Sequence, residues 1–186
     1  MTNLTRRGFA AGAMMAAGTL AACGNPIGGS GAATIDARVA ATLNHMYTAY
    51  PGTRQLASQS SGMLVMPLIS EAGIGLGGSY GRGALVIGET TVDYYSAAGA
   101  SAGIQFGAQQ FSAVLFFMTP EALSGFRQSN GWTAGADVAY ALNDRGEMLS
   151  ASTLTSTSPV IAVVFAQAGF RVGATLEGVK YTRIIP

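Results

Sequence analysis

Glycine recurs in a fixed pattern along this chain, and the pattern restricts the fold more than any other feature. A six-residue element, Ala-Gly-apolar-variable-apolar-small, begins at residues 72, 102 and 168, and a weaker copy begins at residue 134. Such alternation is typical of a β-strand. Glycine between the apolar positions allows close backbone approach or sharp bending. We therefore predict four equivalent strands of a strongly curved, mainly antiparallel sheet. The alternative is that glycine-rich composition alone produces the matches.

Two of these copies carry opposite charges at the same variable position. Asp137 occupies it in the third copy and Arg171 in the fourth. If the strands are equivalent, both side chains leave the sheet on one face, because side chains alternate along a strand. Asp137 and Arg171 are therefore candidate partners across the sheet.

Helical signals flank the glycine-rich region. Residues 33–50 predict an N-terminal helix that Thr34 caps and Pro51-Gly52 ends. We expect its apolar stripe to pack on the domain rather than on a membrane: Ile35, Val39, Leu43 and Met46. Residues 120–129 predict one further short helix, with Thr119 as its cap and proline in the first turn.

Short apolar runs predict buried strands at residues 63–69, 84–87, 113–118 and 160–166. The sequence thus indicates an α+β fold with a barrel-like, glycine-rich sheet.

The N-terminus has the features of an export signal. Arg6 and Arg7 precede a short apolar stretch that ends in Leu-Ala-Ala-Cys, where Cys23 is the only cysteine. The stretch is well short of the roughly 20 residues that cross a bilayer. It resembles the lipobox of bacterial lipoproteins, whose cysteine is acylated, and Arg6-Arg7 resembles a twin-arginine motif. The alternatives are a cleaved soluble leader and the general export route.

This interpretation divides the chain into a signal peptide at residues 1–22, a flexible tether at 23–32 and one domain at 33–186. The tether is rich in glycine and serine. Gly24 follows the cysteine, which by resemblance to lipoprotein sorting signals favours the outer membrane over the inner one. We expect a lipid-anchored protein on the periplasmic face of the cell envelope.

Composition and missing motifs argue against several functions. Only 10% of residues are charged, and the net charge of +1 becomes −1 without Arg6 and Arg7. A near-neutral domain lacks the basic surface that nucleic acid requires. The glycines at 73–78 have dinucleotide-site spacing but no following helix, so we expect no nucleotide. His45 is the only histidine, which disfavours a metal site or a catalytic triad. We predict no enzyme activity and no cofactor, and we place His45 on a solvated helix face.

The domain resembles the SYLF family of lipid-binding modules. Several blocks carry the resemblance in the family's order: residues 72–81, 101–109, 131–136, 168–178 and 180–184. Glu71 departs from it, since a basic residue is common there. The resemblance implies a non-catalytic α+β domain that binds phospholipid headgroups.

We take four basic residues as candidate headgroup contacts: Arg82, Arg171, Lys180 and Arg183. The alternative function is a structural or protein-interaction lipoprotein without a lipid ligand beyond its own anchor. An envelope protein would then contact an aromatic patch formed by Tyr80, Tyr94, Tyr95 and Trp132.

Overall fold

The computed structural model describes residues 30–135, 138–141, 158–165 and 176–186. Cys23, Asp137 and Arg171 lie outside these ranges, so the proposed lipid anchor and the Asp137–Arg171 pair stay predictions. Within the described part, every helix is too short or too polar to cross a membrane.

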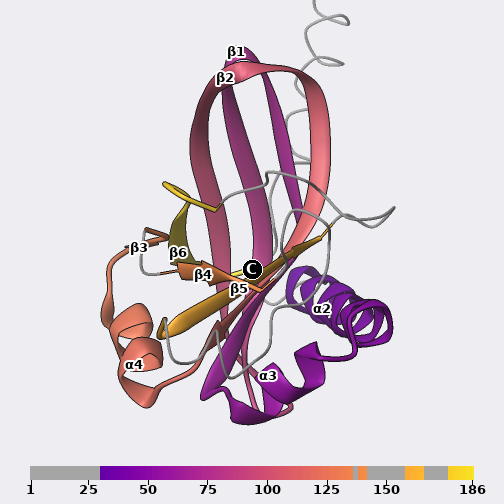
Figure 1. Ribbon diagram of the computed structural model, residues 1–186, viewed down its shortest axis with the longest axis vertical. Helices are drawn as coiled ribbons and strands as arrows, with labels where there is room; N and C mark the ends of the chain where they lie inside the picture. The colour runs from indigo at the N-terminus through magenta and orange to yellow at the C-terminus, as the bar shows by residue number, and fades with distance from the viewer. Residues whose placement is uncertain (1–29, 136–137, 142–157, 166–175) are drawn as a thin grey trace, which may run out of the picture.

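One long hairpin dominates the structure. Strand β1 (Gly62–Ile87) pairs with the antiparallel strand β2 (Thr90–Phe117), and Gly88 takes the positive φ of 62° that the connecting turn requires. Both strands rise above the rest of the domain, bend over and return (Figure 1). The predicted strands 63–69 and 84–87 are thus the two ends of one strand, and 113–118 is the end of its partner. Expecting separate strands there was wrong.

The first two copies of the glycine element form the middle of this hairpin. Gly73 pairs with Gly107 and Leu76 with Ala102, on either side of a register shift. The first copy therefore lies in β1 and the second in β2, and the two pair directly with each other in one bent ribbon. The third copy leads into strand β4 (Val138–Tyr140), and the fourth lies outside the described residues. Glycine bends a strand without ending its pairing, which explains why β1 and β2 continue past the glycine elements.

The bend presses the two halves of β1 together. A Cβ on Gly81 would lie 2.6 Å from the carbonyl oxygen of Leu68, and one on Gly83 would lie 2.0 Å from that of Val65. Neither distance is compatible with a side chain larger than hydrogen. These glycines allow backbone contact that holds the hairpin folded.

In the described part of the chain, the hairpin belongs to a sheet of six strands in which β2 is central. The order is β3-β6-β2-β5-β4, with β1 also paired to β2. The remaining strands are β3 (Trp132–Thr133), β5 (Val160–Phe165) and β6 (Lys180–Ile184). Among the pairs between described strands, β4–β5 alone is parallel. The predicted α+β class with a strongly curved, mainly antiparallel sheet is confirmed.

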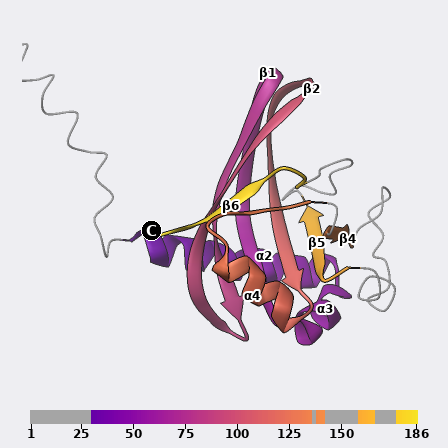
Figure 2. The same cartoon turned by 90° about the vertical axis from the view of Figure 1, so that its left-hand side faces the viewer.

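Helices cover both faces of the sheet. Helices α2 (Gly31–Ala49) and α3 (Thr53–Gln59) lie on one face and α4 (Pro120–Gln128) on the other (Figure 2). Strand residues alternate between two cores accordingly: Val65 packs with the α2 side and Leu64 with the α4 side. Burial on both faces explains why these strands read as continuous apolar runs.

The predicted helices are confirmed, with two corrections. Thr119 caps α4 by accepting a hydrogen bond from the Ala122 N–H at 3.1 Å, as expected. Thr34 does not cap α2, because its hydroxyl donates to the Ser30 carbonyl at 2.6 Å inside the first turn. Pro51-Gly52 ends α2, but α3 follows directly and was not predicted. Its short sequence, with Thr53 and Leu56 buried, lacks a repeating apolar stripe.

The contact at Gly83 can be tested by adding one methyl group. Gly83→Ala is expected to lower the free energy of unfolding by about 3 kcal/mol, because the backbone must open to admit the Cβ. Gly125→Ala is the matched control, since a Cβ there meets nothing within 4 Å and alanine favours the helix. Urea denaturation of both variants checks this. Equal stability of Gly83→Ala and the wild type would contradict the proposed close packing.

Candidate functional site

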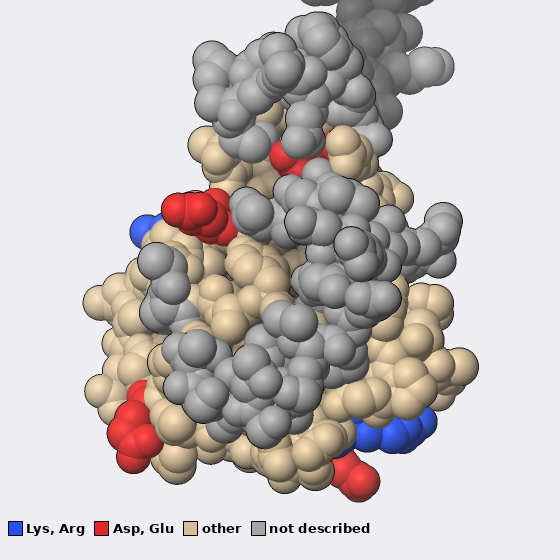
Figure 3. Space-filling view, viewed as in Figure 1, with Lys and Arg blue, Asp and Glu red and all other residues tan. Residues whose placement is uncertain are grey.

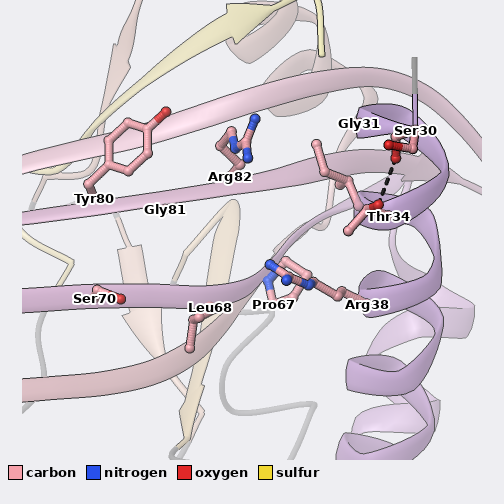
Figure 4. A pocket seen from close by; sticks show the side chains of 11 residues that line it. Ser30, Gly31, Thr34, Arg38, Pro67, Leu68, Ser70, Tyr80, Gly81 and Arg82 are labelled. Atoms are coloured by element: carbon pink, nitrogen blue, oxygen red, sulfur yellow. Dashed lines mark hydrogen bonds between the residues drawn. The ribbon is translucent and has the colours of Figure 1, made fainter. Parts of the chain in front are cut away.

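A hollow of about 330 Å³ lies between the first turns of α2 and strand β1. The helix contributes residues near Ser30 and Thr34, and the strand contributes two separate stretches, 67–70 and 80–82. Figure 4 shows these elements side by side around the hollow. The stretches meet only because β1 folds back on itself.

Two arginines from different elements reach this hollow. Arg38 extends from α2 and Arg82 from β1, and both are exposed. Arg82 alternates with Gly81 and Gly83, so its side chain leaves the strand opposite to their backbone contacts. Within the described residues neither arginine forms an ion pair. Both guanidinium groups are therefore available to an anion.

The start of α2 adds to the positive character of the hollow. Ser30 and Gly31 line it, and the first turn of the helix contains no acidic residue. The free N–H groups of a first turn carry a partial positive charge. Helix and arginines thus act in the same direction on a bound anion.

Asp36 holds α2 against the hairpin. Its carboxylate accepts hydrogen bonds from the Thr91 hydroxyl at 3.0 Å and the Tyr94 hydroxyl at 2.9 Å. Burial raises the pKa of the Tyr94 hydroxyl, and the hydrogen bond to Asp36 raises it further. These contacts occupy the acidic side chain nearest in sequence to Arg38 and fix the first half of the helix.

Arg183, a predicted headgroup contact, is bound elsewhere. Together with Arg127 it forms an ion pair with Asp93, whose side chain is only 5% exposed. This group lies beside α4, across the sheet from α2. It is therefore separate from the hollow at Arg38 and Arg82.

Residues 98–183 match the Ysc84 family, described as a Las17-binding protein actin regulator. This segment is similar to the Ysc84 domain, also called SYLF. The match confirms the resemblance seen in the sequence and is consistent with a domain that binds lipid or protein partners. No curated protein matches the chain.

The matched segment begins within β2 and ends within β6, so Arg38 and Arg82 precede it. Lys180 lies inside it, with its side chain over Gly131, where a Cβ would lie 3.2 Å from the ammonium nitrogen. Arg38 and Arg127 were not predicted, because no sequence spacing relates them to the partners that the fold brings near.

The aromatic patch predicted from the sequence does not form. Tyr95 is 3% exposed and stacks on Phe126, and Trp132 packs partly buried in the same core. Tyr80 alone of the four is largely exposed, at 57%. That patch was wrong because strand alternation sends neighbouring tyrosines to opposite faces. His45 is exposed on α2, as predicted, and its ring lies 5.8 Å from that of Phe165.

Charged side chains form small separate spots on the face drawn in Figure 3. This agrees with the low charge content of the sequence. Among the described residues, no group of three or more His, Cys, Asp or Glu is placed to hold a metal ion.

The Asp93 ion pairs predict a stability effect. Asp93→Asn is expected to lower the free energy of unfolding by about 2 kcal/mol, because two guanidinium groups lose their buried counter-charge. Arg127→Gln leaves Arg183 in place and should cost under about 1 kcal/mol. Thermal unfolding of the two variants measures the difference. A larger loss for Arg127→Gln than for Asp93→Asn would contradict the central position of the carboxylate.

Proposed function

We propose that this protein is a lipid-anchored envelope protein whose folded domain, residues 33–186, binds an anionic phospholipid without catalysis. The headgroup lies in the hollow between α2 and β1. The observation that carries the proposal is the pair of exposed arginines, Arg38 and Arg82, which both line the hollow and form no ion pair among the described residues.

The chemistry of the hollow suits a phosphate group. A guanidinium presents a planar fork of N–H donors that matches phosphate oxygens, and two such forks neutralise a headgroup phosphate. Ser30 and Thr34 line the same space. Because both arginines are exposed, salt will screen this attraction, so binding will weaken at high ionic strength.

The position of Cys23 supports the same site. Seven peptide steps separate it from Ser30, which lines the hollow. Such a segment spans at most about 25 Å. An acylated Cys23 would therefore keep the hollow within that distance of the bilayer surface. Of the predicted contacts, Arg82 keeps this role, and Arg171 and Lys180 stay candidates.

The second candidate function is binding of an envelope protein partner. Tyr80 favours it, since it lines the hollow and is 57% exposed, and tyrosine is enriched at protein interfaces. The family description names protein binding as well. Absence of vesicle binding by the full-length chain would favour this function.

Vesicle binding tests the headgroup site. In the full-length Cys23→Ser chain, Arg38→Gln and Arg82→Gln should each weaken binding to phosphatidylglycerol vesicles about fivefold, because a basic side chain near an anionic surface contributes about 1 kcal/mol. Sedimentation over a salt series measures the affinity.

Arg54→Gln is the matched control, since it removes the same charge from α3, where the guanidinium lies 4.8 Å from the Tyr47 ring. Equal weakening by Arg54→Gln would show that net charge, not the hollow, determines binding. Unchanged binding in Arg38→Gln/Arg82→Gln would remove both residues from the site.

Lipidation is tested separately. Cys23→Ser should move the full-length protein from the membrane fraction to the soluble envelope fraction and abolish incorporation of a labelled fatty acid, because stable anchoring requires the acyl chains. Ser30→Ala serves as the control and should stay in the membrane fraction. Fatty-acid labelling that persists in Cys23→Ser would contradict the lipobox interpretation.

A further inference from the structure

A second group of basic side chains surrounds a buried carboxylate on the α4 side of the sheet. Asp93 projects from β2, Arg127 from the last turn of α4 and Arg183 from β6. Arg127 Nη2 donates to Asp93 Oδ2 at 3.3 Å, and Arg183 Nη2 donates to Asp93 Oδ1. Three elements distant in sequence thus place two guanidinium groups next to one another.

This arrangement leaves an excess positive charge. One carboxylate faces two guanidinium groups, and each of its oxygens is occupied by one of them. Each guanidinium has five N–H donors, so most donors remain free. The arginine side chains are 43% and 63% exposed, whereas Asp93 is 5% exposed. The buried carboxylate of Asp93 therefore orients both guanidinium groups, and the parts of these groups that do not contact it face solvent.

These outer edges line a hollow of about 540 Å³. No carboxylate lines it among the described residues. Its other polar groups are Ser61, Ser124 and Gln128, and its apolar wall is Pro120 and Leu123. Hydroxyl and amide groups add neutral donors beside the charge, while the apolar wall leaves room for an organic substituent.

We propose that this hollow is a binding site for a phosphate monoester, with Arg127 and Arg183 as the two contacts to its oxygens. A phosphate monoester dianion offers three strong acceptor oxygens, whereas a carboxylate ligand offers two. Two oriented guanidinium groups therefore match a phosphate better than a carboxylate. The site lies on the α4 side of the sheet, whereas the hollow at Arg38 and Arg82 lies on the α2 side. It therefore does not depend on the proposed headgroup site.

Thermal unfolding of the full-length protein in inorganic phosphate or glycerol phosphate tests the site, with sodium chloride of equal ionic strength as reference. At ten times the dissociation constant, we expect phosphate to raise Tm by about 4 °C. Arg127→Gln/Arg183→Gln should lose this rise, and Arg38→Gln/Arg82→Gln should keep it. No rise beyond that in chloride, or an equal rise in Arg127→Gln/Arg183→Gln, would overturn the proposal.

Arg127→Lys/Arg183→Lys guards against loss of folding, because lysine keeps the charge beside Asp93 but lacks the planar fork. It should unfold near the wild-type temperature in chloride and respond to phosphate less than half as strongly. A full phosphate response in this variant would also overturn the proposal.

Phosphatidic acid vesicles distinguish the source of the phosphate. In Arg38→Gln/Arg82→Gln chains, vesicle binding that depends on Arg127 and Arg183 would support the site with a lipid as its source. Stabilisation by glycerol phosphate without such binding would support it with a soluble ester.

Discussion

The close contact between the two halves of β1 is the constraint on which the rest of the structure depends. Gly81 and Gly83 meet the backbone at Leu68 and Val65, so the long hairpin folds back instead of extending. In the folded hairpin, two segments of β2 pair with further strands: residues 94–98 with β6 and residues 112–117 with β5. Because β2 connects the sheet in this way, both cores form around one ribbon.

Both proposed binding sites depend on the arrangement that this bend creates. It carries Arg82 back toward the start of α2, where the hydrogen bonds of Asp36 to Thr91 and Tyr94 keep the helix in place. On the other face, the central position of β2 lets Asp93 contact Arg127 and Arg183.

One buried hydroxyl group in this densely packed core lacks a hydrogen-bond partner within the part of the chain that the structure describes. The Tyr181 oxygen is buried without a hydrogen-bond partner among the described residues, and burial raises its pKa.

Local signals in the sequence predicted those features that depend on interactions between near neighbours, namely helix starts and buried strands. The Thr119 cap and Pro120 define the start of α4, and the apolar runs mark strands that are buried on both faces. The prediction failed where the result depends on pairing at a distance. The sequence predicted the apolar runs and the glycine elements as separate strands, but β1 and β2 each continue through both. Helix α3 was not predicted, because tertiary packing rather than intrinsic helix propensity stabilises a helix of only seven residues.

The sequence by itself determined a curved, glycine-rich α+β domain, because alternation, capping and small residues act between near neighbours. The resemblance to the SYLF family, which the match over residues 98–183 confirms, added Arg82 as a headgroup candidate. Only the tertiary structure decided that Arg38 joins Arg82, that Arg183 turns instead to Asp93, and that Tyr95 and Trp132 enter the core. The reason is that these outcomes depend on the register of β2 with its partners and on the fold of the hairpin, neither of which is encoded within one segment.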